Sequence, residues 1–546
     1  MPVQSSNPPD IRTLEKWQGL NQQARRGSIG DDEEWWNENL FAIGAGNLRS
    51  CWGHGPSLYN VMANHPAAPP GTKIVRMFFG FVGDALGPFQ YPPPGRKAFL
   101  FLSNGAVDLV DLDTGFVNKL GSIWEPVAPY YWASAKVWRP KFFGNVAGQA
   151  GGWLLGSPQG LYAWDGTLYS PGDVAPDWLT NALETAPEAP PFYMPTGLPG
   201  IFTMEVYQNR LWVAGRDVMS YSAPSNGADF STTGGGGSMG YFGDRLTVSY
   251  ADLAQAAGYM FCFGDSSTDV VSNVQLQGQG TPESPFVTSF NYLNVDPQVG
   301  QRFPRPVGRF GRHMIQFNGA GIFMTSGGDA QPIGDRVTDI LVTLDTSQYL
   351  PTMCAATMFN FRVILINGRF TDPWGITRNL ILMWHPVGGG GQPFWSVASQ
   401  GLELTNIGAY EQDSIITPYG TDGIDLYQLF AQPDPTLVKR LSTKAYRGGG
   451  GNTSLTIKNY KRLYIELEDN DGRGVSFTGV QTSGGGVPGG SEDVAFDMPA
   501  GVQRDIIGVP TSGQGIWCQV DLQSFSPDFT IQRLHSAVEE RVLFGA

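Results

Sequence analysis

Short apolar runs joined by turns rich in glycine and aspartate recur along most of this chain. The clearest example is Asn209–Phe230, NRLWVAGRDVMSYSAPSNGADF, in which an apolar run at Leu211–Ala214 and a second run at Val218–Ser222 flank a Gly-Arg-Asp turn. Two short apolar runs joined by such a turn are typical of a β-hairpin. A Pro-Ser-Asn-Gly loop then follows the second run. This pattern predicts a hairpin with no evident catalytic group.

Similar hairpins recur from residue 70 to residue 430. The other pairs of apolar runs are 97–102 with 107–112, 152–155 with 161–164, 259–263 with 270–274, 313–317 with 322–325, 362–366 with 380–384, and 414–417 with 424–429. Their spacing of roughly 40 to 60 residues is the size of a propeller blade of four short strands. We therefore expect an all-β protein whose residues 61–440 form a β-propeller of six or seven blades. A large sandwich or barrel assembly is the alternative, since no WD or kelch signature marks the repeats.

The two ends of the chain differ from this repeating part. Residues 1–60 are expected to form an N-terminal extension with a short helix, because Ser28 and Asp31 fit a capping box and the acidic run 31–34 suits the positive end of a helix. That helix would carry Trp35 and Trp36. Residues 441–546 contain further strand-like runs, such as RLYIEL and GIWCQVDL, and predict a C-terminal β-sandwich-like module.

Composition adds an expectation about assembly. Only 15% of the 546 residues are charged, against roughly 25% in typical soluble domains. A large chain with so few charges is expected to cover part of its surface with protein contacts, so we expect an oligomer. The net charge of −14 and the pI of about 4.8 argue against tight wrapping of nucleic acid, which needs clustered Lys and Arg.

The chain offers little sign of enzyme chemistry. Its 5 histidines form no HExxH or paired ligand spacing. The glycine-rich stretches 234–237, 388–391 and 448–451 lack the lysine of a phosphate-binding loop and are interpreted as connectors. Cys51, Cys262, Cys354 and Cys518 have no CxxC spacing, so we expect buried free thiols. We assign no catalytic, cofactor-binding or metal-ligating residue and expect no enzyme activity.

The start of the sequence gives no sign of export. MPVQSSNPPD lacks a basic and then apolar signal region, and no run approaches 18 apolar residues. We expect synthesis in a cytosol and no membrane span.

Three regions resemble one protein family. The first is Gly19–Gly53, GLNQQARRGSIGDDEEWWNENLFAIGAGNLRSCWG, and the second is Asn209–Phe230 with its continuation MGYFGDRLTVSY. The third comprises KRLYIELE, GIWCQVDL and TIQRL near the C-terminus. Together they resemble the β-propeller tail proteins of short-tailed bacteriophages (podoviruses). The segment His54-Gly55-Pro56 and the long glycine-rich loops depart from the family's pattern.

The resemblance implies a structural virion protein, a tail hub or nozzle (tail tubular) subunit. Six copies would form a ring below the portal and the head–tail adaptor and line the channel through which viral DNA leaves. The implied partners are the adaptor, other tail proteins and tail fibres or spikes, and the implied location is the phage tail after synthesis in the host cytoplasm. The net charge of −14 suggests an acidic lumen that would keep DNA from sticking.

Two further expectations concern interfaces and the competing function. Trp35 and Trp36 are the candidate interface residues, because paired aromatic side chains need a surface to pack against; core packing within one chain is the alternative. A sugar-binding propeller, adhesin or glycosidase-like, is the competing function. It is suggested by the 15 Trp and 20 Tyr, most of which lie inside strand-like runs, and no pair of glycosidase carboxylates can be located.

Overall fold

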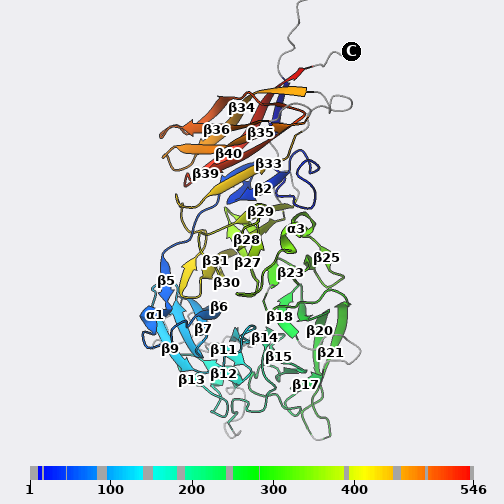
Figure 1. The fold of residues 1–546 in the computed structure, drawn as a ribbon. Coiled ribbons are helices and arrows are strands. Elements are labelled where there is room, and N and C mark those ends of the chain that lie inside the picture. Colours follow the sequence, from blue (N-terminus) through cyan, green and yellow to red (C-terminus); the bar gives the residue numbers. More distant parts are fainter. Residues whose placement is uncertain are drawn as a thin grey trace, which may run out of the picture.

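The computed structural model describes residues 10–14, 17–44, 46–82, 95–138, 152–180, 191–240, 250–281, 283–305, 307–386, 393–412, 414–446, 457–485 and 490–541. Two modules lie one above the other, a β-propeller built from the middle of the chain and a β-sandwich built from both ends (Figure 1). The glycine-rich stretches 388–391 and 448–451 lie outside the described residues.

The propeller consists of blades that place one strand each next to the central axis. Six blades are separate four-stranded antiparallel sheets, and β26–β29 fill the remaining place in the ring as the first four strands of a nine-stranded sheet. The inner strands are β6 (Ile74–Val82), β10 (Ser134–Trp138), β14 (Thr203–Tyr207), β18 (Tyr250–Ala256), β22 (Val307–Phe310), β26 (Thr352–Met358) and β30 (Asn406–Gln412). The expectation of a β-propeller is therefore confirmed.

Each hairpin expected from the sequence supplies the two middle strands of a blade. These strands are β7 (Gly95–Leu102) and β8 (Ala106–Asp111), β11 (Gly152–Ser157) and β12 (Gly160–Trp164), β15 (Arg210–Ala214) and β16 (Val218–Tyr221), β19 (Tyr259–Gly264) and β20 (Thr268–Gln277), β23 (His313–Phe317) and β24 (Ile322–Thr325), β27 (Phe361–Thr371) and β28 (Thr377–His385), and β31 (Ile415–Thr421) and β32 (Asp425–Gln428). The middle strands carry the strongest apolar runs because both of their faces pack against neighbouring blades.

The outer strands are more varied in length. They are β9 (Val117–Ser122), β13 (Leu168–Tyr169), β17 (Gly237–Gly240), β21 (Val287–Asp296), β25 (Gln331–Pro332), β29 (Phe394–Ala398) and β5 (Ser57–Asn60). Strand β5 comes from the N-terminal part of the chain and pairs with β32, the last strand of the propeller in sequence order. This pairing closes the ring, because one blade is made from two distant parts of the sequence.

The apolar core of the propeller lies between adjacent blades. Buried side chains of the first and second blades, such as Phe99 and Trp153, share one cluster, and those of the second and third blades, such as Leu154 and Met204, share another. Corresponding clusters continue around the ring and return to the first blade, where Leu100 packs with Tyr419 of the last. The ring is thus closed by packing as well as by strand pairing.

The C-terminal module is a sandwich of two sheets around one apolar core. One sheet contains β1 (Asp10–Leu14), β3 (Leu40–Ile43), β4 (Asn47–Ser50), β34 (Ile457–Asp469), β37 (Arg504–Pro510), β38 (Gln514–Gly515) and β40 (Phe529–Arg541). The other contains β2 (Glu34–Glu38), β33 (Lys439–Thr443), β35 (Val475–Gly484), β36 (Gly490–Met498) and β39 (Trp517–Ser524). The first 60 residues are therefore shared between this sandwich and the blade that β5 completes.

Strand β2 joins the two modules. It pairs with β29 of a propeller blade on one side and with β33 of the sandwich on the other, so one sheet of nine strands runs through both modules. The helical elements of the described chain are short: α1 (Val61–Asn64), α2 (Asp177–Thr180), η1 (Asp335–Val337) and α3 (Thr338–Leu341).

The expected N-terminal helix with Trp35 and Trp36 is wrong, because Glu34–Glu38 is strand β2. The acidic residues before it serve separate partners and not a helix end. Asp31 pairs with Lys444 at 2.7 Å, and Glu33 pairs with Arg336 at 3.2 Å. Long-range strand pairing and these ion pairs outweigh the local preference for a helix start.

Candidate functional site in the propeller channel

The inner strands of the propeller enclose a cavity of about 440 Å³ on the central axis, and residues from every inner strand line it. Its charged lining residues are Lys136, Glu205, Asp252, Arg305, Arg309 and Glu411. A concave site lined by apolar side chains with a few converging charged groups is the usual form of a ligand site. None of these residues is among those predicted from the sequence.

Arg305 stands out in the channel by its backbone and its packing. It has a φ of 74°, in the left-handed region that residues with a side chain rarely adopt, at a strain of about 1–3 kcal/mol. Its guanidinium carbon lies 3.5 Å from the ring centre of Phe78, and Nη1 donates a hydrogen bond of 2.9 Å to the carbonyl oxygen of Met77. Burial lowers the pKa of Arg305 to about 10, while Asp252 offsets part of this.

A second guanidinium group lies beside it. Arg76, on β6, is only 4% exposed. It donates hydrogen bonds to the carbonyl oxygens of Tyr131, at 3.0 Å, and Tyr130. Burial, and after it the positive charge of Arg305, lower the pKa of Arg76 to about 9, while Asp252 acts in the opposite direction. Two arginines therefore repel each other next to the channel.

The nearby carboxylates are engaged by other groups. Glu205 accepts a hydrogen bond of 2.8 Å from the ammonium group of Lys136. Asp252 accepts a hydrogen bond of 3.0 Å from the hydroxyl of Thr203. The channel thus holds a cluster of charged side chains that can orient a small polar or charged ligand by hydrogen bonds and electrostatic attraction.

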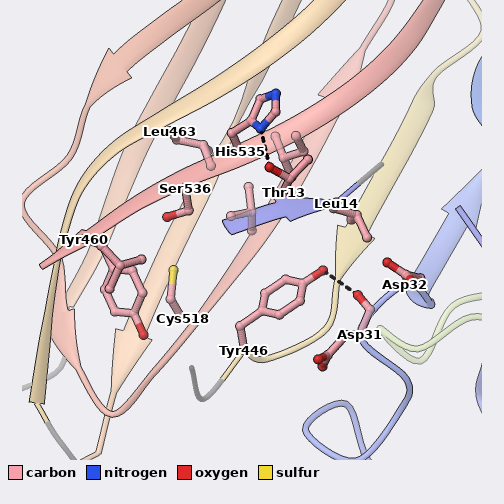
Figure 2. Close-up of a pocket in the computed structure, with 13 residues that line it drawn as sticks. Thr13, Leu14, Asp31, Asp32, Tyr446, Tyr460, Leu463, Cys518, His535 and Ser536 are labelled. Carbon is pink, nitrogen blue, oxygen red and sulfur yellow. Dashed lines mark hydrogen bonds between the residues drawn. The ribbon is translucent and has the colours of Figure 1, made fainter. Parts of the chain in front are cut away.

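A second cavity, of about 310 Å³, lies in the sandwich and is drawn in Figure 2. The hydroxyl of Thr13 and Nδ1 of His535 are 2.8 Å apart, and the hydroxyl of Tyr446 donates a hydrogen bond of 3.2 Å to the backbone carbonyl of Asp31. Cys518 also lines this cavity, and burial raises the pKa of its thiol to about 12. A thiol with so high a pKa stays protonated at neutral pH and is a weak nucleophile.

The two candidate interface residues have different surroundings. Trp36 is fully buried, belongs to the core between two blades, and its indole N–H donates a hydrogen bond of 3.2 Å to Glu38. Trp35 is partly buried under the guanidinium group of Arg26, which lies 4.7 Å from its ring centre. Both rings contact the edge or face of Trp374, which is 48% exposed. Trp36 therefore packs inside its own chain, and Trp374 presents the exposed indole at this place.

Glu38 holds the junction between the modules together. It is fully buried and receives two hydrogen bonds from Arg378, of 2.6 and 2.8 Å, one to each carboxylate oxygen. Arg440 of the sandwich lies 3.8 Å from the same carboxylate. Two-point contacts of this kind fix geometry as well as charge, so they set the position of the sandwich on the propeller.

The cysteines, possible metal ligands and possible membrane spans can also be located in the structure. All four cysteines are buried, and none forms a disulfide within the described part of the chain, in line with the expectation. Among the residues that the structure describes, no group of three or more His, Cys, Asp or Glu side chains could hold a metal ion. Within the same ranges, no helix is long and apolar enough to span a bilayer.

Sequence reasoning missed the channel residues because they come from separate blades. Lys136, Glu205 and Asp252 lie inside three different inner strands, and Arg305 lies just before a fourth, so nothing in the local sequence groups them. The one local signal is at Arg305, which stands between Pro304 and Pro306 immediately before an inner strand.

Comparison with known proteins adds little to this picture. The chain matches no protein-family model and no curated protein. Two of the solved structures that it resembles are crystal structures of BBS1N in complex with ARL6DN. The likeness to the one soaked with lead has 11% identity and a TM-score of 0.38 over 70% of this chain and 98% of that chain. For the one soaked with mercury, the identity is 11% and the TM-score 0.37 over 67% and 94% of the two chains.

A third solved structure is that of S. cerevisiae dbp5 l327v bound to nup159, gle1 h337r, IP6 and ADP. The likeness has 12% identity and a TM-score of 0.24 over 79% of this chain and 97% of that chain. Since all three TM-scores are below 0.5, these likenesses carry no argument about function.

Proposed function

We propose that this chain is a structural subunit of the tail of a short-tailed bacteriophage, a hub or nozzle protein that assembles as a ring of about six copies. The observation that carries the proposal is the nine-stranded sheet that runs from the propeller into the sandwich. Together with the buried contact between Glu38 and Arg378, it gives a subunit whose two modules have one fixed relative position. Such a subunit suits a closed ring, in which every copy must present the same surfaces to its neighbours.

The segments that resemble the phage family lie at the places that define this architecture. Residues 19–53 contain β2, which joins the modules, and residues 209–230 contain the middle strands of one blade. The C-terminal segments supply parts of β34, β39 and β40 of the sandwich. The low charge content supports large contacts between subunits, and exposed apolar side chains such as Trp374 and Ile376 offer surface for them.

In this role, the subunits line a passage for viral DNA and contact the head–tail adaptor, other tail proteins and tail fibres or spikes. The net charge of −14 supports an acidic lumen that repels the phosphate backbone and lets the DNA slide. Substituting Lys for the carboxylates that face the lumen of the assembled ring should slow DNA ejection. Unchanged ejection would contradict this part of the proposal.

Sedimentation of the purified chain together with a glycan array tests the proposal against the competing function. A ring should sediment at about six times the chain mass of 59.2 kDa, without a glycan signal. A monomer that binds glycans would instead identify a sugar-binding propeller.

A further inference from the structure

Positive charge exceeds negative charge in the inner part of the propeller channel. The cavity is lined by Lys136, Arg305 and Arg309 and by the carboxylates of Glu205, Asp252 and Glu411. Arg76, whose charge interacts with that of Arg305, adds a fourth cation against these three carboxylates. The chain as a whole has a net charge of −14, so this excess is local. Burying a charge without a partner is unfavourable, and a bound anion would balance it.

The carboxylates of this cluster leave Arg305 without a direct ion pair. Glu205 is engaged by Lys136, and Asp252 accepts a hydrogen bond from Thr203. Within the described part of the chain, no carboxylate lies within ion-pair distance of Arg305. There its guanidinium group donates one hydrogen bond, to the carbonyl oxygen of Met77. A guanidinium group has five N–H donors, so Arg305 keeps donors for a ligand in the cavity that it lines.

The surroundings of Arg305 hold its guanidinium group in place. One face stacks on Phe78, and Nη1 is fixed by the hydrogen bond to Met77. The left-handed backbone at Arg305 is a strained conformation of the kind found at ligand clamps. A planar guanidinium group held in this way can bind two oxygens of one anion side by side.

We propose that the propeller channel contains a binding site for an oxyanion, a carboxylate or a phosphate group, with Arg305 as its direct ligand. Arg76 and Lys136 supply the positive potential behind it. Carboxylates and phosphates share the pair of oxygens that a guanidinium group recognises, and the cavity of about 440 Å³ leaves room for the rest of a small organic anion. This site belongs to the single chain, so it stands or falls independently of the proposed ring.

Thermal unfolding of the full chain in matched concentrations of anions tests the proposal. Sodium phosphate and sodium acetate are compared with sodium chloride at equal ionic strength and pH, because an anion that binds only the folded state raises the Tm. The expected result is a rise in Tm with phosphate or acetate beyond that in chloride. The arm with the larger rise distinguishes a phosphate site from a carboxylate site, and equal Tm in all three salts would overturn the proposal.

Variants then locate the binding. Arg305→Gln should abolish the specific rise, whereas Arg473→Gln should keep it, since Arg473 is an arginine of the sandwich with a side chain 69% exposed. Arg305→Lys keeps the charge but loses the planar fork, so calorimetric titration with the effective anion should give a Kd at least tenfold weaker. If Arg305→Gln does not fold, the Arg305→Lys titration decides, and an unchanged Kd there would overturn the proposal. An equal Tm rise in a folded Arg305→Gln variant would overturn it as well.

Discussion

Glu34 allows a quantitative test of the junction between the propeller and the sandwich. Its side chain is fully buried in β2. Within the described part of the chain, neither carboxylate oxygen accepts a hydrogen bond. Burial, reinforced by the charge of Glu33, raises its pKa from 4.5 to about 8, although Arg336 and backbone N–H groups offset part of the effect. The folded protein therefore keeps this proton at neutral pH, while the unfolded chain has lost it.

The sign of the pH dependence follows from this difference. Between pH 4.5 and 8, the folded state binds more protons than the unfolded state, so the free energy of unfolding falls as pH rises. Each pH unit in this window corresponds to about 1.4 kcal/mol. From pH 5 to pH 7.5 the loss is about 3 kcal/mol, or a Tm decrease of about 3–6 °C, depending on how much of the chain unfolds as one unit.

The assay is thermal unfolding followed by tryptophan fluorescence at a series of pH values. Glu34→Gln keeps the shape and removes the titration, so its Tm relative to the unmodified chain should rise by about 3–6 °C between pH 5 and pH 7.5. His385, whose pKa burial lowers to about 4, adds a slope of the opposite sign that is common to both proteins and cancels. Glu411→Gln, at a side chain 53% exposed, is the control. A Tm difference between Glu34→Gln and the unmodified chain that stays constant with pH would refute the reasoning.

Three further substitutions test packing and charge. Glu38→Gln should destabilise the chain by about 3 kcal/mol because it breaks a buried ion pair. Glu411→Gln, in an exposed ion pair, should cost only about 0–1 kcal/mol. Equal losses of Tm in the two variants would contradict this. Trp36→Ala should lower the Tm by an amount equivalent to about 3–5 kcal/mol, and by the same amount at every protein concentration, because Trp36 packs inside its own chain. A Tm loss that varies with protein concentration would instead indicate a subunit interface. Gly215→Ala should destabilise the chain because the new Cβ would lie 2.2 Å from a backbone oxygen, whereas a Cβ at Gly240 would meet open space. Thermal unfolding followed by circular dichroism compares Gly215→Ala with Gly240→Ala. Similar Tm values would show that the turn at Gly215 can adjust.

The sequence predicts the propeller through its middle strands. The run at Leu211–Ala214 is apolar at every position because both of its faces are buried between blades, and such runs are visible without the structure. Outer strands such as Leu168–Tyr169 are two residues long and partly exposed, so no local pattern marks them. The pairing of β5 with β32 joins residues far apart in the chain, and a local pattern cannot reveal it.

The failed helix and the missed channel have related physical causes. Residues 28–38 have a good local helix-start signal, but β2 has a strand neighbour on each side and buries four side chains, Trp36 and Glu38 among them. Arg305 and Phe78 of the first blade approach each other only after the ring closes. Local patterns report what a segment prefers by itself, so contacts made by ring closure stay invisible to them.

Imaging of the purified protein tests the central claim most directly. Negative-stain electron microscopy should show rings of about six subunits, each with a propeller module and a sandwich module in one fixed relative position. Dispersed single particles of 59.2 kDa at concentrations that saturate assembly would contradict the proposed tail subunit.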